Sequence, residues 1–433
     1  MHADRLGVVR LFAAIAVTLS SAVAHAAGPA SPATDLVLVA DPELGMEGGV
    51  RSVDSVIRVV LRYDEVMPTF IRLDEKRPNE KVAAVVARLL QTAAIDFPIA
   101  ELLSTFTHEV YGHGARGREF GRAPVYSFSL PASYSWLLAP DDHSSHSGTT
   151  DFTSGRGGQV DQALPGNFGG IEANLTASHW MTTRIVANDG NAHHGELLAY
   201  MAKTVYADSV YGHKIDRLGG TDAGNDVSNY VTNLQDRFNR VSAADRVSIA
   251  SHLRTAYAWN LLDPTLLFAA WSTVRFVALG DRASTLPMPR AYGIAMYPST
   301  RFALSPFGAE HYLDLFFAKN GVVANVYGRA GSSGLATYDG LGVRVLGWEP
   351  LPGRLGLGGE LDVWTQPETL LVERNVYERT QILGANVAAH ATLYLGERFG
   401  ITGKLALKSR GYLMSEPIAG GPYGYLGIAV RAF

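Results

Sequence analysis

Apolar and polar residues alternate strictly along the last third of the chain. Between residues 355 and 363, leucine or valine stands at the odd positions 355, 357, 361 and 363, and Gly356, Gly358, Glu360 and Asp362 stand at the even positions. A period of two is typical of a β-strand with one apolar and one polar face. The same alternation recurs at 383–395 and 399–408, and turn residues separate such segments. We therefore predict an antiparallel meander of about eight strands over residues 285–433, closed as a barrel or folded as a sandwich.

The preceding part of the chain follows the period of an α-helix instead. Helical patterns cover 82–94, a segment that begins near Pro98, 171–186, 196–207 and 243–279, the last with a break at Asp263-Pro264. Proline is tolerated in the first turn of a helix, so Pro98 is expected to mark the start of a second helix. We expect residues 27–284 to form a mainly helical domain. The predicted fold class is α+β, with the helical domain before the stranded one.

The stranded region is compatible with two environments. In a soluble barrel the apolar face turns inward, whereas in an outer-membrane barrel it faces lipid and small or charged residues line the interior. The polar face here is rich in Gly, Ala, Asn and Thr, with single charges such as Arg344 and Lys404, and the chain ends in Phe433. In this respect the region resembles bacterial outer-membrane β-barrels, which end in phenylalanine. Both environments remain open on this pattern.

The N-terminus has the layout of a secretory signal peptide. Arg5 and Arg10 precede an apolar stretch at 11–23 that ends in small residues near Ala26. We expect residues 1–26 to be removed and the mature chain to be exported to the periplasm or the outer membrane. Beyond this leader no run of about eighteen apolar residues is free of charge, so we expect no transmembrane helix.

Composition restricts the chemistry further. The chain has no cysteine, so a metal ion would have to be bound by His, Asp or Glu. Its formal net charge is -4, which gives no electrostatic reason to expect nucleic acid as a partner.

The strongest candidate for chemistry is the segment His108-Glu109-Val110-Tyr111-Gly112-His113. A zinc hydrolase needs neutral imidazoles that converge on one ion and a carboxylate nearby to take a proton from water. The two histidines are five residues apart, and on a regular α-helix this spacing rotates one side chain by about 140° from the other. A one-residue π-bulge at Gly112 would absorb the extra residue. We therefore expect a local distortion that lets both imidazoles face one ion.

Together with Gly114, this segment resembles the H-E-x-x-G-H motif of the dipeptidyl peptidase III family of zinc metallopeptidases. The resemblance covers these residues alone. It implies that His108 and His113 bind zinc and that Glu109 polarises the catalytic water. In that family a glutamate on a downstream helix is the third ligand. The matching position here is Glu172, which opens a predicted helix.

Three further residues are candidates for support of this site. His179 lies seven residues after Glu172, hence on the same helical face, and could bind the ion or hold a ligand in place. Arg116 follows the motif closely and could bind a substrate carboxylate or a developing oxyanion. Asn174 ends the segment that contains Glu172 and is a candidate for either kind of contact. The ordinary alternatives are a packed helix histidine and a surface arginine.

These features predict a zinc-dependent hydrolase of the cell envelope, more specifically a metallopeptidase acting on a peptide or other acyl substrate. In this hypothesis Glu109 takes a proton from a zinc-bound water. The alternative is a non-enzymatic outer-membrane barrel protein, used for transport or envelope structure, with a structural metal or none.

Overall fold

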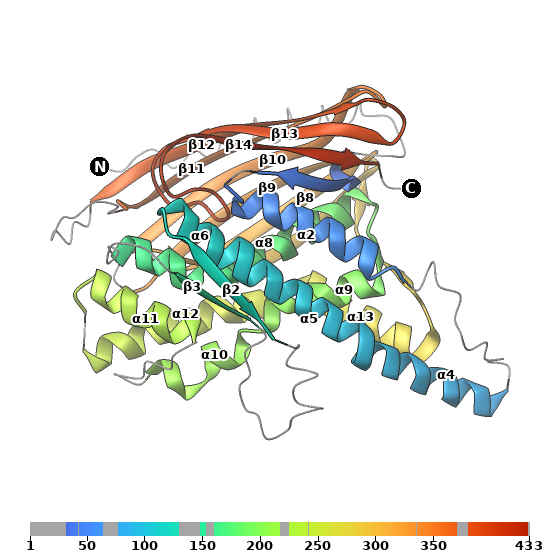
Figure 1. Ribbon diagram of the computed structural model, residues 1–433, viewed down its shortest axis with the longest axis horizontal. Helices are drawn as coiled ribbons and strands as arrows, with labels where there is room; N and C mark the ends of the chain where they lie inside the picture. Colours follow the sequence, from blue (N-terminus) through green and yellow to red (C-terminus); the bar gives the residue numbers. More distant parts are fainter. Residues whose placement is uncertain are drawn as a thin grey trace.

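The computed structural model describes residues 32–41, 43–63, 77–129, 148–152, 160–216, 225–240, 242–334, 336–369 and 380–431. The expected signal peptide and Phe433 lie outside these residues. The described residues combine helices with one large antiparallel sheet, which confirms the α+β class. Figure 1 shows the sheet as one layer and the helices as a second layer beneath it.

The large sheet has ten strands, where about eight were predicted. They run in the order β1-β14-β13-β12-β11-β10-β9-β8-β7-β6, so the stranded region is an open sheet and the expected closure is wrong. The additional strand β1 comes from the N-terminal region and pairs with β14, a contact between distant segments that leaves no local sequence signal. The strands are β1 (Leu36–Ala40), β6 (Arg290–Ala291), β7 (Ile294–Ser305), β8 (Gly308–Lys319), β9 (Val322–Ser332), β10 (Thr337–Leu351), β11 (Leu355–Pro367), β12 (Gln381–Tyr394), β13 (Phe399–Lys408) and β14 (Gly421–Val430).

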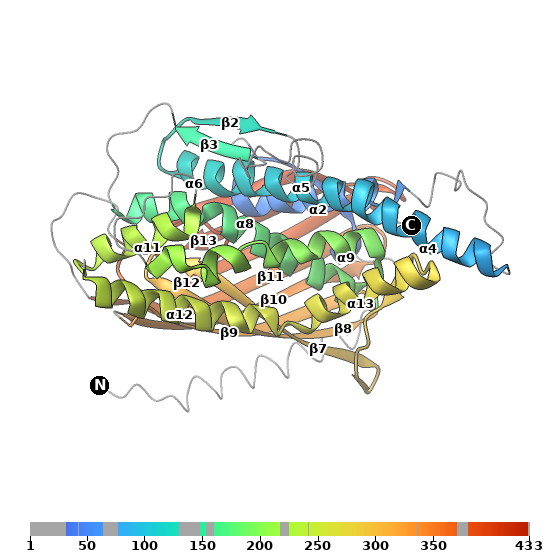
Figure 2. The same ribbon diagram turned by 90° about the horizontal axis from the view of Figure 1, so that it is seen from below.

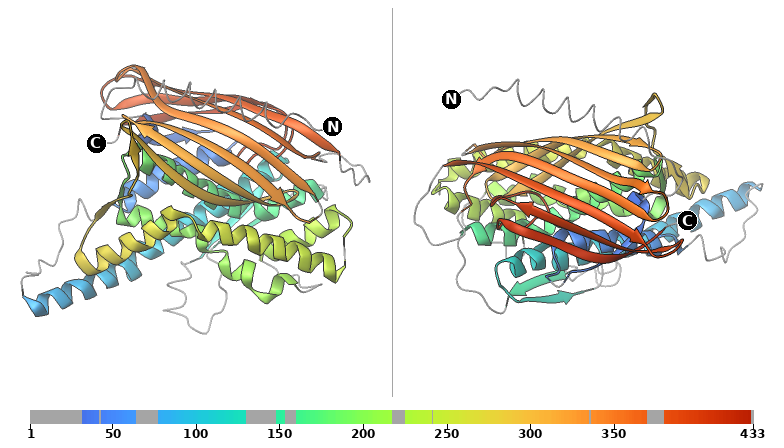
Figure 3. Two further views of the ribbon diagram at one scale, coloured as in Figure 1. Left: turned by 180° about the vertical axis from the view of Figure 1, so that it is seen from behind. Right: turned by 90° about the horizontal axis from the view of Figure 1, so that it is seen from above.

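The polar face of this sheet is the one that the helices cover. In β12 the side chains of Asn386, His390 and Thr392 are buried, whereas Leu383 on the opposite face is 79% exposed. Figure 2 shows the helices lying across one face of the sheet, and the right-hand view of Figure 3 shows the other face uncovered. The distribution of polarity is therefore reversed from that of a sheet with an apolar core face.

Buried charges on the covered face are paired. The cross-strand ion pairs are Arg301–Asp314 at 2.8 Å, Arg329–Glu310 at 3.0 Å and Arg344–Glu360 at 2.7 Å. Lys404 adds contacts to Glu416 at 2.7 Å and to Glu47 of α2 (Met46–Val60). A buried charge without a partner is strongly destabilising, so the pair of Lys404 with Glu47 favours the contact of α2 with the sheet.

A continuous helical stretch of 41 residues runs from Asn79 to Glu119, where two helices were predicted. Its parts are α4 (Pro78–Gln91), the π-helical turn η2 (Thr92–Asp96), α5 (Phe97–Phe106), the π-helical turn η3 (Thr107–His113) and α6 (Gly114–Glu119). In a regular helix the ring of Pro98 would clash with the carbonyl four residues earlier. The π turn directly before Pro98 changes that spacing, so the helix continues through the proline.

This stretch is long and apolar enough to cross a membrane, and only 22% of its most apolar window is buried. The described residues therefore include one helix that could span a membrane by length and composition, and the expectation that there is no transmembrane helix stays a prediction. Asp96 and Glu101 interrupt the apolar run in the sequence, but two charges leave the stretch apolar on average.

The remaining helices pack against the sheet and against one another. They are α8 (Val160–Ala187), α9 (His194–Tyr200), α10 (Ala207–Tyr211), α11 (Asp226–Arg237), α12 (Ala243–Leu261) and α13 (Pro264–Leu279). The chain bends by 54° between α12 and α13, which confirms the break expected at Asp263-Pro264. Helix α8 begins well before the predicted residue 171, since Pro165 and the glycines that follow it lie within the helix. The two large hydrophobic clusters mix residues from α8 with residues from the sheet, so helices and strands share a core.

Two small antiparallel ribbons complete the described structure. Strand β2 (Pro124–Phe128) pairs with β3 (Gly148–Phe152), and β4 (Asn191–His193) pairs with β5 (Ala283–Thr285). The β2–β3 ribbon lies over the helical stretch near η3, and it contributes a residue to the site described below.

Candidate metal centre

The histidine segment adopts the distortion that its spacing requires. Residues Thr107–His113 form the π-helical turn η3, which confirms the expected π-bulge. Gly112 lies against α8 so closely that a Cβ at this position would come within 2.6 Å of the carbonyl oxygen of Gly169. A glycine is therefore needed here for the two helices to approach, and the approach brings α8 against the histidines.

Gly112→Ala is expected to lower the free energy of unfolding by about 1–3 kcal/mol, because the added methyl group meets the backbone of α8. The matched control is Gly166→Ala on α8, where a Cβ would meet nothing within 4 Å. Alanine is favoured over glycine in a helix by roughly 0.5–1 kcal/mol, so this control should be neutral or stabilising. Urea denaturation of both variants measures the difference, and equal stability of the two would contradict the close approach.

The structure brings His108 and His113 together with Asp226, the first residue of α11. The two Nε2 atoms are 3.0 Å apart, and Oδ2 of Asp226 lies 3.0 Å from His108 Nε2 and 3.2 Å from His113 Nε2. Two ligand atoms about 2.1 Å from a tetrahedral zinc ion are separated by roughly 3.4 Å. The observed separations are close to this value, so the three atoms fit around one ion.

The other ring nitrogens are held by oxygen atoms. His113 Nδ1 hydrogen bonds to the carbonyl oxygen of Gly166, which can only accept, so this nitrogen carries a hydrogen. His108 Nδ1 hydrogen bonds to the hydroxyl of Tyr206, and the oxygen of this hydroxyl accepts from Nδ2 of Asn174 at 3.0 Å. Such contacts orient metal-binding imidazoles and leave Nε2 free for the ion.

Glu109 lies beside the three converging atoms without being one of them. Its Oε1 is 4.0 Å from His108 Nε2, and its Oε2 accepts a hydrogen bond of 2.6 Å from the hydroxyl of Thr150 on β3. The residue is only 5% exposed. Its carboxylate is therefore close enough to the three converging atoms to hydrogen bond to a water molecule bound among them.

The electrostatics of the site favour a positive charge between the histidines and the carboxylate. Burial alone lowers the pKa of His113, but the adjacent carboxylate of Asp226 outweighs burial and raises this pKa to about 9. Burial likewise raises the pKa of Asp226, and the two imidazoles outweigh it, so the pKa of this carboxyl lies below its usual range. The side chain of Asp226 is 26% exposed, so the centre can be reached from solvent.

The structure does not bring Glu172, the expected third ligand, to the histidines. Its carboxylate pairs with Arg116, whose Nε donates to Oε2 at 2.8 Å, and accepts a hydrogen bond from the backbone N–H of Ser415. Glu172 lies within α8 rather than at the start of a helix, and it is fully buried. The carboxylate of Glu172 therefore faces the sheet and not the histidines. The carboxylate that lies beside the two histidines is that of Asp226.

The other candidates have distinct positions. Arg116 also donates to the carbonyl oxygen of Glu416, so it links α6 to the loop before β14 and is not turned toward the three converging atoms. His179 packs against Phe316 of β8, where burial first and neighbouring arginines second hold its pKa well below the usual value. Asn174 alone connects to the centre, through Tyr206.

Sequence reasoning missed Asp226, Tyr206 and Thr150. Asp226 is 118 positions from His108, and its local signal is that of a helix start, since Asn225 caps α11 by accepting from the N–H of Ser228. An acidic residue after an N-cap is ordinary, so no local pattern distinguishes it from a solvated helix terminus.

A second group of possible ligands, Glu47, Glu360 and His390, also has donor atoms within 4.8 Å of one another. Lys404 places its ammonium between the two glutamates, 3.2 Å from Glu360, and Arg344 lies 2.7 Å from Glu360. These cations already supply the positive charge, so this group is not a metal centre of the same kind.

Comparison with known proteins leaves the site to be interpreted on its own geometry. No protein-family model, no curated protein and no solved structure matches this chain.

Proposed function

We propose that this chain is a zinc-dependent hydrolase whose ion is held by His108, His113 and Asp226. The observation that carries the proposal is the convergence of two Nε2 atoms and one carboxylate oxygen within 3.2 Å. These atoms are all electron-rich when the imidazoles are neutral, and a cation among them removes their repulsion. Two imidazoles and one carboxylate form one of the donor sets of catalytic zinc.

The proposed chemistry is general-base hydrolysis. A zinc ion at this place would lower the pKa of a bound water to near neutral and polarise a carbonyl oxygen. Glu109 would take the proton from the attacking water through Oε1, which faces His108 Nε2 at 4.0 Å. Thr150 positions Glu109 by donating to Oε2, so the other oxygen keeps its capacity to accept.

We propose the peptide bond as the bond that is hydrolysed. The basis is that the segment from His108 through Gly114 resembles the motif of the dipeptidyl peptidase III family. In that family both histidines of the motif bind zinc. Here Asp226 replaces the glutamate that the resemblance implies as third ligand, so the proposal carries over the reaction and not the fold.

The test measures metal content and hydrolysis on one preparation of the purified chain. We expect elemental analysis to find about one zinc per chain, and a chelator to remove both the zinc and the cleavage of a quenched peptide library. Added zinc should restore cleavage, and magnesium serves as the control because it prefers oxygen ligands. A chain that retains no zinc at micromolar free zinc would overturn the proposal.

A further inference from the structure

The uncovered face of the sheet is apolar over six adjacent strands. The residues of β9 to β14 that point away from the helices are called the outer face. Its leucines include Leu383 and Leu405, which are 79% and 71% exposed, and its neighbouring strands add Leu393, Ile401, Leu407 and Leu426. These residues are cross-strand neighbours on one surface, as in the pairs Leu393 with Ile401 and Val387 with Leu407. A contiguous apolar surface of this kind marks a site of contact with a partner or a membrane.

Charges are rare on this surface and gather near its two ends, where Asp339 near the start of β10 points outward. In β11 to β14 no Asp, Glu, Lys or Arg points outward among the described residues. The charged residues Lys319, Arg354 and Arg398 lie at the turns of one end, and Ser409-Arg410 lies at the other. An apolar band bounded by charged turns matches the cross-section of a bilayer, with hydrocarbon in the middle and polar headgroups on both sides.

The strand lengths agree with this match. Strands β13 and β14 have 10 residues each and β12 has 14. A strand needs about 9–11 residues to cross the hydrocarbon of a bilayer when tilted.

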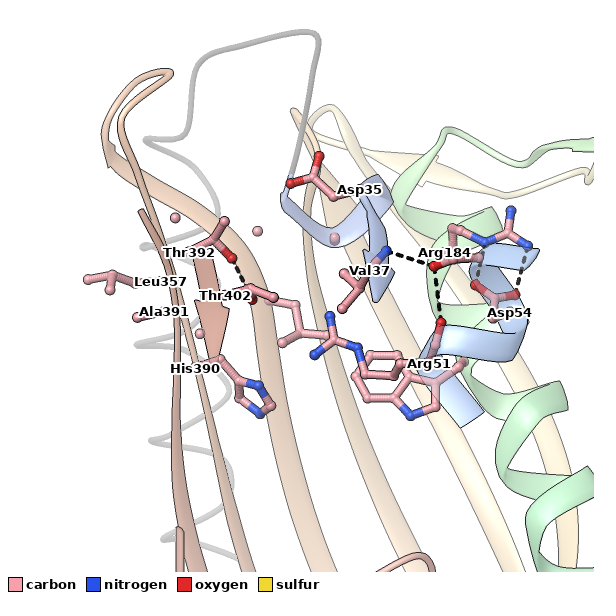
Figure 4. Close-up of a pocket in the computed structure, with 17 residues that line it drawn as sticks. Asp35, Val37, Arg51, Asp54, Arg184, Leu357, His390, Ala391, Thr392 and Thr402 are labelled. Atoms are coloured by element: carbon pink, nitrogen blue, oxygen red, sulfur yellow. Dashed lines mark hydrogen bonds and ion pairs between the residues drawn. The ribbon is translucent and has the colours of Figure 1, made fainter. Parts of the chain in front are cut away.

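At both edges of the open sheet, side chains from the helix layer form hydrogen bonds with backbone groups of the strands. At one edge, the backbone N–H groups of Val37 and Val39 in β1 donate to Ser55 and Ser52 of α2 at 2.7 and 2.8 Å. Figure 4 shows the bond from Val37 beside a polar interior lined by Thr392, Thr402 and His390. Hydrocarbon does not tolerate unpaired backbone groups, so an open sheet in a membrane requires such caps.

Similar bonds occur at the opposite edge, where β6 pairs with only the first two residues of β7. In β7, the carbonyl oxygen of Ser305 accepts from the hydroxyl of Tyr230 at 2.7 Å, and that of Thr300 accepts from Lys203 Nζ at 3.1 Å. The helical stretch Asn79–Glu119 adds an observation from outside the sheet, because only 22% of its most apolar window is buried. Strands and helices both run lengthwise along the molecule in Figure 2, so both could align with one bilayer normal.

We propose that the outer face lies against the hydrocarbon of a lipid bilayer, with the strands crossing it and the polar helix-covered face turned away from lipid. The occupant is lipid rather than a second copy of the chain, because charged turns at both ends suit headgroups on two sides. None of the observations behind this proposal uses the three converging atoms of the metal centre.

The test uses the absence of cysteine in the chain, which permits single-site labelling. Leu383→Cys and Leu405→Cys carry an environment-sensitive fluorophore on the outer face, and Arg240→Cys, exposed after α11, is the control. The full chain is reconstituted in phosphatidylcholine vesicles whose acyl chains carry a nitroxide quencher. We expect blue-shifted, quenched emission at 383 and 405, and at least several-fold weaker quenching at 240.

The alternatives give different results. Labels at 383 and 405 that escape quenching in the vesicles would overturn the proposal. Pyrene excimer formation at 405 in the absence of lipid would instead identify a second copy on this face. The double variant Leu383→Glu, Leu405→Glu should reduce vesicle-bound protein roughly tenfold or more, since charges on a lipid-facing strand oppose insertion. Arg240→Glu should leave it unchanged.

Discussion

Glu109→Gln is expected to lower kcat for peptide hydrolysis by about 10²–10⁴-fold, because an amide cannot take a proton from water. The bound zinc should remain, since Glu109 is not among the three converging ligand atoms. The amide oxygen can still accept from Thr150, so the substitution should leave the geometry of η3 intact. The measurement is kcat and zinc content on the same sample.

The control for this variant is Glu80→Gln, which changes a glutamate on the same helical stretch that forms an ion pair with the exposed Arg77. Its kcat should equal that of the unmodified chain. If Glu109→Gln retained both zinc and full activity, Glu109 would not be the base. If the unmodified chain bound zinc and cleaved no peptide, the metal would have a structural role, as in the non-enzymatic alternative.

Asp226→Ala is expected to weaken zinc binding by at least about 100-fold, because it removes one of three ligands; loss of a group that merely supports a ligand already costs 10–100-fold. Competition with a chromogenic chelator measures the affinity. Asp236→Ala is the matched control, because Asp236 is an exposed aspartate near the other end of α11. It should bind zinc as tightly as the unmodified chain.

Glu172→Gln separates the two possible third ligands. It should keep the zinc affinity but lower the free energy of unfolding by about 1–3 kcal/mol, because it removes one of the two carboxylates that pair with the buried guanidinium of Arg116 and leaves only Glu119. Loss of zinc in Glu172→Gln with retention in Asp226→Ala would return the third ligand to Glu172 and contradict the geometry described above.

Local pattern was sufficient for part of this protein. The period-two alternation around Leu355 and Leu383 predicts strands because side chains of a strand point to opposite faces, and these strands are present. The spacing of His108 and His113 predicts a π-helical turn because a regular helix cannot turn both rings to one side, and η3 is that turn. Such features depend on residues a few positions apart, so the sequence of these residues is sufficient to predict them.

Tertiary structure alone decided the rest, because those contacts join residues that no local period relates. The third ligand atom comes from Asp226, which reaches the histidines only when α11 packs beside η3 and α8. The pairing of Glu172 with Arg116 and the addition of β1 to the sheet are of the same kind. Alternation also cannot determine which face of a strand is covered, since both orientations have the same period. Here the covered face is the polar one, and its charges are paired within the sheet, as Arg344 is with Glu360, or with a helix, as Lys404 is with Glu47.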